Sequence, residues 1–330
     1  MSVGTTEVPQ VTGASTSSWV RSVVAAVHER VVGQDDAVEG LLIALLTGGH
    51  ILLEGLPGLA KTLMVRTLAE AIRTDFRRIQ FTPDLLPTDI VGTPVFDQKS
   101  GDFRVQKGPI FSNIILADEI NRAPPKVQAA LLEAMEERQV TIAGETYALG
   151  SPFMVLATQN PVELHGTYPL AEAQLDRFAL KLEIGYPTRA EEKTIAERVA
   201  RGNHIPIEAA ATVDQIMADR ERVAAVHLDD KILDYIVDLT FATREPAACG
   251  LQDLEDLIEF GASPRATISL ARTSRARAYL RGRDYVLPDD VQAMAPAVMR
   301  HRLKTTYEAD ARGVDAGEVV RRVLAAVPSP

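Results

Sequence analysis

The chain has 330 residues, of which 46% are hydrophobic and 24% charged, a composition typical of globular proteins. Its formal net charge of −10 disfavours a protein whose main partner is nucleic acid, because phosphate binding favours a basic surface. The single cysteine, Cys249, cannot form an internal disulfide, and no apolar run approaches the ~20 residues needed to cross a bilayer. These features predict a cytoplasmic protein with about two domains and no membrane insertion.

The first 18 residues are rich in Ser, Thr and Gly, and we expect them to form a flexible tail. Five short, β-prone apolar blocks follow, most of them separated by helical patterns such as Lys61–Ile72 and Pro125–Arg138. Strand–helix alternation of this kind predicts a parallel sheet with helices on both faces, which is an α/β fold. The blocks are His50–Leu53, Arg78–Phe81, Asn113–Ala117, Phe153–Thr158 and Ala179–Ile184.

Two stretches interrupt this alternation, and each is predicted to form an inserted β-hairpin. The first joins Thr93–Phe96 to Phe103–Gln106, and the second joins Gln139–Ile142 to Thr146–Leu149. After Pro187 the sequence shows helical periodicity and almost no strand pattern. We therefore expect an α/β domain over residues 19–187 and an all-α domain over residues 188–330.

A glycine-bearing loop follows the first apolar block. The segment HILLEGLPGLAKT, residues 50–62, matches the phosphate-binding pattern G-x-x-x-x-G-K-[ST], except that Ala60 replaces the last glycine. Glycines let backbone amides approach phosphate oxygens, the lysine reaches the outer phosphates, and the threonine hydroxyl can ligate Mg²⁺. The alternative is a glycine turn followed by an exposed lysine. The predicted nucleotide-binding residues here are Gly55, Leu56, Pro57, Gly58, Leu59, Ala60, Lys61, Thr62 and Leu63.

Two adjacent carboxylates end the third apolar block, in the segment NIILADEIN. Asp118 and Glu119 fall at the carboxyl end of a predicted strand, where open α/β sheets bind their ligands. Asp118 is placed to hold Mg²⁺ through water, and Glu119 to orient and deprotonate an attacking water. Two solvated acids at a strand end are the alternative. Because a phosphate-binding loop lies on the same predicted sheet, the pair indicates hydrolysis of ATP with Mg²⁺.

Several long segments, in order, resemble the MoxR family of AAA+ ATPases. They are EGLPGLAKT, FTPDLLPTDIVG, NIILADEINRAPPKVQAALLEAMEERQVT, ATQNP, YPLAEAQLDRF and GASPRA. The resemblance extends from Gly33 to about Leu303, and Ala60 is usual in this family. It implies a P-loop αβα sandwich with a five-stranded parallel sheet, followed by an all-α lid domain. The two hairpins resemble those of the AAA+ branch that contains magnesium chelatase and the replicative helicases.

The resemblance also assigns expected roles to polar residues outside the two motifs. Asn160 resembles the sensor that contacts the attacking water or the γ-phosphate. Arg177 resembles the arginine finger that reaches a neighbouring subunit's nucleotide, although an ion pair with Asp176 or Glu172 is an equally good interpretation of the sequence. Arg265 resembles the second sensor, although it could be a surface arginine that pairs with a nearby acid. Gly33 and Gln34 resemble the segment that contacts the adenine.

The function that the resemblance implies is ATP hydrolysis in a hexameric ring of identical subunits. The lid would rotate about a hinge near Pro187, and the ring would remodel or activate client proteins. Partners with von Willebrand factor A domains and insertion of metal cofactors are also implied. Two alternatives remain open at this point. One is a motor stimulated by nucleic acid, which the acidic balance disfavours, and the other is a nucleotide-dependent scaffold without turnover, which intact Lys61, Asp118 and Glu119 disfavour.

Overall fold

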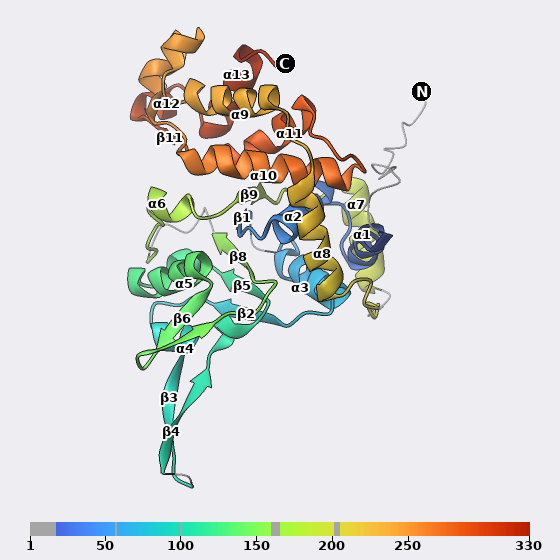
Figure 1. The fold of residues 1–330 in the computed structure, drawn as a ribbon, viewed down its shortest axis with the longest axis vertical. Helices are drawn as coiled ribbons and strands as arrows, with labels where there is room; N and C mark the ends of the chain where they lie inside the picture. Colours follow the sequence, from blue (N-terminus) through green and yellow to red (C-terminus); the bar gives the residue numbers. More distant parts are fainter. Residues whose placement is uncertain (1–17, 57, 100, 160–165, 201–204) are drawn as a thin grey trace.

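The computed structural model describes residues 18–56, 58–99, 101–159, 166–200 and 205–330 (Figure 1). Its central sheet has five parallel strands in the order β2–β5–β8–β1–β9. The five apolar blocks of the sequence supply these strands, and the predicted parallel α/β sheet is confirmed. The bounds are β1 (Ile51–Glu54), β2 (Phe76–Gln80), β5 (Ile114–Asp118), β8 (Met154–Gln159) and β9 (Leu180–Glu183).

Helices cover both faces of the sheet because alternate residues of its strands point to opposite sides. In β5, Ile114 and Leu116 are buried in one hydrophobic cluster, whereas Ile115 and Ala117 are buried in the other. The first cluster includes residues of α1 (Ser18–Arg30), α2 (Asp35–Thr47) and α3 (Lys61–Ala71), and it continues into helices that follow Pro187. The second includes residues of α5 (Pro125–Glu137) and of the short α4 (Pro87–Val91).

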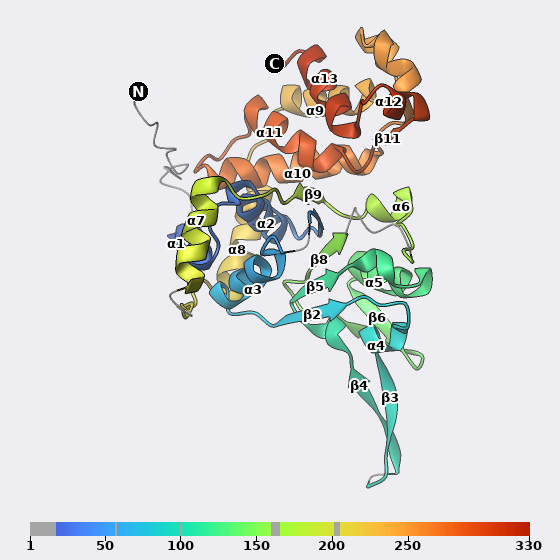
Figure 2. The ribbon, with the colours of Figure 1, turned by 180° about the vertical axis from the view of Figure 1, so that it is seen from behind.

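Both predicted hairpins are present. In the first, β3 (Gly92–Asp97) pairs with β4 (Asp102–Lys107), and in the second, β6 (Gln139–Ile142) pairs with β7 (Glu145–Ala148). The first hairpin extends far from the body of the molecule (Figures 1 and 2). On it, Phe96 and Phe103 meet edge to face, with ring centroids 5.4 Å apart, and both side chains are exposed.

The region after Pro187 is mainly helical, as expected, with one small antiparallel pair, β10 (Ile258–Phe260) and β11 (Lys304–Thr305), that the sequence pattern did not predict. No helix in the described ranges is long and apolar enough to span a bilayer. The short α6 (Glu172–Leu175) precedes β9. The helices that follow β9 are α7 (Arg189–Ala200), α8 (Val213–Ala225), α9 (Asp230–Ala242), α10 (Pro264–Leu280), α11 (Pro288–Met299), α12 (Tyr307–Ala311) and α13 (Ala316–Ala326).

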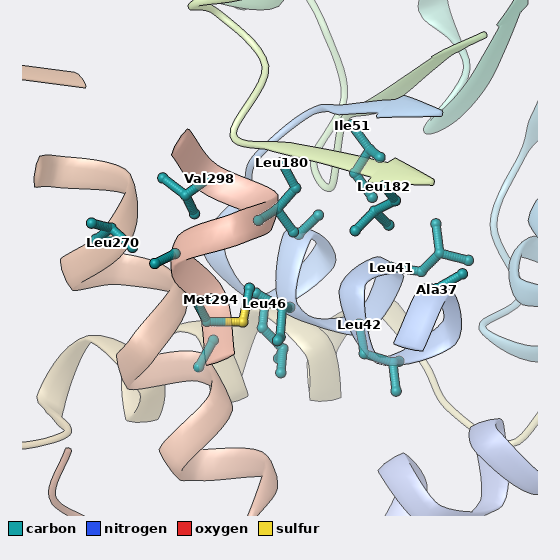
Figure 3. Close-up of a cluster of buried hydrophobic side chains, with 14 of the residues drawn as sticks. Ala37, Leu41, Leu42, Leu46, Ile51, Leu180, Leu182, Leu270, Met294 and Val298 are labelled. Carbon is teal, nitrogen blue, oxygen red and sulfur yellow. The ribbon is translucent and has the colours of Figure 1, made fainter. Parts of the chain in front are cut away.

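One hydrophobic cluster joins the sheet to these helices. Leu46 of α2, Leu180 of β9, Leu270 of α10 and Val298 of α11 belong to it, and all are fully buried or nearly so (Figure 3). The same cluster continues to Val323 in α13. The helical region therefore shares its core with one face of the sheet. A domain boundary near residue 187 stays a prediction.

Candidate functional site

The phosphate-binding pattern forms a tight loop between β1 and α3. Gly55 has to be a glycine, because a Cβ there would lie 2.7 Å from the backbone oxygen of Ile184. Ala60 precedes the first residue of α3 in a left-handed conformation, with φ of 58°. This conformation costs an alanine roughly 1–2 kcal/mol, which explains why the general pattern has glycine there. Gly58 is also left-handed, at φ 86°.

Lys61 lies at the start of α3, with its ammonium group folded over the loop. Its Nζ donates to the Gly55 backbone oxygen at 2.6 Å. Partial burial lowers the pKa of Lys61, while the nearby carboxylates of Asp118, Glu119 and Glu54 oppose this shift. The ammonium is therefore partly desolvated and surrounded by acids, in the position expected for a group that binds phosphate.

The two predicted acids lie at the carboxyl end of β5, in a strained but well-held geometry. Glu119 is left-handed, with φ of 57°, a conformation that costs a non-glycine residue about 1–3 kcal/mol. Its backbone N–H donates to Thr158 Oγ1 at 2.8 Å, and that hydroxyl donates to Asp118 Oδ1 at 2.5 Å. Thr158, at the end of the neighbouring strand β8, thereby fixes both acids.

Three side chains that the sequence did not indicate contact Oδ2 of Asp118 and Oε2 of Glu119. Arg78 donates to Asp118 Oδ2 through Nε at 2.9 Å and through Nη2 at 2.6 Å. Gln80 Nε2 donates to Glu119 Oε2 at 3.0 Å, and Arg122 Nε lies 2.7 Å from the same oxygen. The only sequence signal for Arg78 and Gln80 is their spacing of two along a strand, which puts both on one face.

The loop and the acids line one cavity of ≈ 410 Å³, a volume within the range of ligand-binding pockets. The predicted convergence of Lys61, Thr62, Asp118 and Glu119 is thus present in the geometry, although their catalytic roles stay predictions. Hydroxyl and carboxylate oxygens are the donors that Mg²⁺ prefers, and it usually takes only one or two of them from the protein beside nucleotide phosphates and waters. Thr62 and Asp118 therefore fit as the residues that would hold Mg²⁺.

The segment predicted to contact adenine lies next to the phosphate loop. Gly33 and Gln34 are both left-handed, with φ of 69° and 64°. Gln34 Nε2 donates to the Gly185 backbone oxygen at 3.0 Å, and the preceding residue, Ile184, is the one that packs against Gly55. This proximity is compatible with an adenine contact. Two other predicted residues, Pro57 and Asn160, lie outside the described residues.

Arg177 and Arg265 lie together, but not beside the phosphate loop. Arg177 Nε is 2.6 Å from Glu136 Oε2, and Arg265 Nη2 is 2.5 Å from Glu136 Oε1. Both arginines line a second cavity of ≈ 320 Å³ together with His50 and Ala179, the residues that precede β1 and β9. This cavity is at the amino ends of those strands, whereas the phosphate loop follows the carboxyl end of β1.

Arg177 pairs with Glu136 and not with either of the two acids that the sequence suggested, Asp176 and Glu172. Asp176 accepts instead from Arg302 Nε at 2.8 Å, and Glu172 lies 3.5 Å from Lys304 Nζ. Glu136, which Arg177 does contact, is 41 residues away in the chain. The alternative interpretation of Arg265 is an arginine that pairs with a nearby acid. Its ion pair with Glu136 fits that interpretation.

Comparison with known proteins agrees with this arrangement. Residues 50–180 match the model of the ATPase family associated with various cellular activities (AAA), and residues 252–323 match the AAA lid domain. The chain is 48% identical to Chaperone MoxR1 of Mycobacterium tuberculosis, over 91% of this chain and 79% of that protein. It is 32% identical to Protein MoxR of Methylorubrum extorquens, over 92% and 93% of the two chains.

A solved structure gives the same answer for the fold. A protein of Cytophaga hutchinsonii, 47% identical in sequence, superposes with a TM-score of 0.90 over 94% of this chain and 95% of that one. YeaC of Bacillus subtilis is 46% identical over 93% of both chains. The fold, the phosphate loop followed by an acid pair, and this extent of identity lead to one conclusion. The chain belongs to the MoxR family of AAA+ ATPases.

Proposed function

We propose that this protein hydrolyses magnesium-ATP at the boundary between two copies of itself in a ring, and uses the reaction to remodel client proteins in the cytoplasm. One observation carries the proposal. Lys61, Asp118 and Glu119 line one cavity, while Arg177 and Arg265 line another at the opposite end of β1. A single chain therefore holds two incomplete halves of a site for phosphoryl transfer.

The first half supplies nucleotide binding and activation of water. The loop amides and Lys61 would bind the phosphates, and Thr62 and Asp118 would hold Mg²⁺, which would supply neutralisation of phosphate charge. Glu119 orients the attacking water and accepts its proton. Since Gln80 and Arg122 both hold Glu119 Oε2, we assign acceptance of the water's proton to the other carboxylate oxygen, Oε1.

The second half supplies positive charge to a neighbour. Arg177 and Arg265 share the two oxygens of one carboxylate, Glu136, so the two guanidinium groups point to nearly the same place. A terminal phosphate, which has three oxygens, could replace Glu136 as their common partner. In comparable systems an arginine supplied in this way contributes 10³–10⁵ in rate. On this proposal Arg265 serves the neighbour's nucleotide together with Arg177.

Sharing of this kind requires head-to-tail contacts, and such contacts close into a ring when the rotation permits. We take the ring to be a hexamer, as the family resemblance implies. The name of the mycobacterial relative, a chaperone, supports client remodelling as the output. A partner with a von Willebrand factor A domain, and insertion of a metal cofactor into the client, are the finer forms of this proposal.

Mixing of two inactive variants tests the shared site. Arg177→Ala and Lys61→Ala should each abolish ATP hydrolysis when purified alone. In a mixture, the Lys61→Ala subunit lends its intact Arg177 to a neighbour whose phosphate loop is intact, so part of the activity should return. As the control, each variant is assayed alone at the total protein concentration of the mixture. A mixture as inactive as its components would refute a site shared between subunits.

Two further measurements separate the alternatives. Release of inorganic phosphate by the wild-type protein excludes a scaffold that binds nucleotide without turnover. Added single- and double-stranded DNA should leave this rate unchanged, because the formal net charge is −10. Strong stimulation by DNA at physiological salt would instead favour a nucleic-acid motor.

A further inference from the structure

Arg78 is a charged residue of the first cavity to which neither the sequence patterns nor the proposed chemistry assigns a role. It lies in β2, the edge strand next to β5, and its side chain reaches the end of β5 to contact Asp118. Its side chain is about half exposed, so burial does not demand the contact. Arg78 lines the same cavity as Lys61 and Thr62.

The strand geometry separates Arg78 from the arginine beside it. Successive side chains of a strand point to opposite faces, so Arg77 and Arg78 face different sides of the sheet. Arg78 shares its face with Gln80, two residues on, and its Nη2 donates to Gln80 Oε1 at 2.7 Å. Arg77 is exposed and does not line the cavity. The chain thus offers a matched control one residue away.

Arg78 occupies the oxygen of Asp118 that a hydrated metal ion would need. Thr158 Oγ1 donates to Asp118 Oδ1 and accepts from the Glu119 backbone N–H. The hydrogen bond to Oδ1 therefore helps to fix the positions of both acids. Oδ2 is the remaining oxygen, and both Nε and Nη2 of Arg78 donate to it. A water bound to Mg²⁺ and the Arg78 guanidinium would therefore compete for Asp118 Oδ2.

We infer that Arg78 is a phosphate-binding residue of its own subunit's site, resting on Asp118 until magnesium nucleotide enters and then pairing with the terminal phosphate. This inference rests on the proposed function, because it requires that the cavity binds magnesium-ATP. Repulsion by the divalent cation weakens the guanidinium's contact with Asp118, and the planar fork of donors on arginine suits phosphate oxygens. The γ-phosphate is the anion that ATP would add to this cavity, and ADP lacks it.

The test is a comparison of affinities for two nucleotides. A non-hydrolysable ATP analogue and ADP are titrated, each with excess Mg²⁺, into wild-type protein and into Arg78→Gln and Arg77→Gln, by calorimetry. Loss of a charge-assisted hydrogen bond predicts that Arg78→Gln weakens the ATP analogue about 10- to 100-fold. The affinity for ADP should change less than about threefold, and Arg77→Gln should match the wild type.

A second measurement reports the competition directly. The Mg²⁺ concentration that gives half-maximal binding of ADP should be lower in Arg78→Gln than in wild type, because Asp118 Oδ2 is no longer occupied. Arg78→Lys, which keeps the charge, should recover part of the preference for the ATP analogue. Thermal unfolding shows that each variant is folded.

Different results contradict the inference and the proposed function. If wild type binds both nucleotides and Arg78→Gln keeps the wild-type ratio of affinities, Arg78 only holds Asp118 and the inference is wrong. If wild type binds neither nucleotide in the presence of Mg²⁺, the proposed function fails, and the inference fails with it.

Discussion

Substitution of Asp176 by asparagine should loosen the attachment of the helical region to the sheet. Arg302, which follows α11, has only 2% of its side chain exposed, and its Nε donates to Asp176 Oδ1 at 2.8 Å. Asp176 is the only carboxylate that the described residues give it. Asp176 also accepts from Ser263 Oγ, at the start of α10, at 2.7 Å. Asp176→Asn keeps the shape of this link but leaves a buried guanidinium without its counter-charge.

The structure sets the size of this effect. Loss of one partner of a buried ion pair costs about 3–5 kcal/mol. Arg302 keeps neutral acceptors, including the Phe178 backbone oxygen at 2.7 Å, and Asp176 itself is 17% exposed. We therefore expect the lower end, about 3 kcal/mol of unfolding free energy. Burial already lowers the pKa of Arg302 and Asp176 opposes this shift, so removal of the carboxylate makes the desolvated charge costlier still.

Equilibrium urea unfolding, followed by circular dichroism, measures this loss as a lower midpoint at unchanged slope. Glu172→Gln is the control, because Glu172 is 67% exposed and its ion pair with Lys304 should contribute almost nothing. A loss below about 1 kcal/mol for Asp176→Asn would mean that the neutral acceptors alone satisfy Arg302. The reasoning about the counter-charge would then be wrong.

Two further predictions concern Glu119, the proposed general base, and a buried histidine. Glu119→Gln should bind ATP normally but lose about 10²–10⁴-fold in turnover, measured by phosphate release, and undiminished turnover would remove Glu119 as the base. Burial lowers the pKa of His50 to about 3, so its stabilisation is complete above the unfolded-state pKa of 6.5 and is lost as pH falls towards 3. Unfolding free energy should drop about 1.4 kcal/mol per pH unit in this window from His50 alone. The variant His50→Gln should show a shallower decline than wild type in urea unfolding at pH 7.5 and 5.5, and parallel declines would contradict the assignment.

The strands and the core of the site were predictable because their signals are local in the sequence. The phosphate loop and the acid pair occupy short segments, and the strand–helix alternation places both at the carboxyl ends of parallel strands. The structure adds a reason for one irregularity. Ala60 adopts the left-handed conformation that glycine normally supplies, so the loop keeps its turn despite the substitution.

Contacts between distant segments were not predictable. Arg265 meets Glu136 across 129 residues, and Arg78 meets Asp118 across 40, so no spacing rule connects either pair. The sequence offered Asp176 and Glu172 as partners of Arg177 because they are near it in the chain. Strand order and helix packing decided otherwise, since they bring the end of α5 beside the start of β9.

The hydrophobic cluster that joins α2, β9, α10 and α11 restricts how the molecule can move. A free swing of the helical region about residue 187 would expose Leu46, Leu270 and Val298 to water, and each such exposure costs roughly 1.5–3 kcal/mol. We therefore expect small sliding displacements between packed helices rather than a wide opening. Since α2 begins right after Gln34, which we expect to contact the adenine, such a shift would move this expected nucleotide contact together with α2.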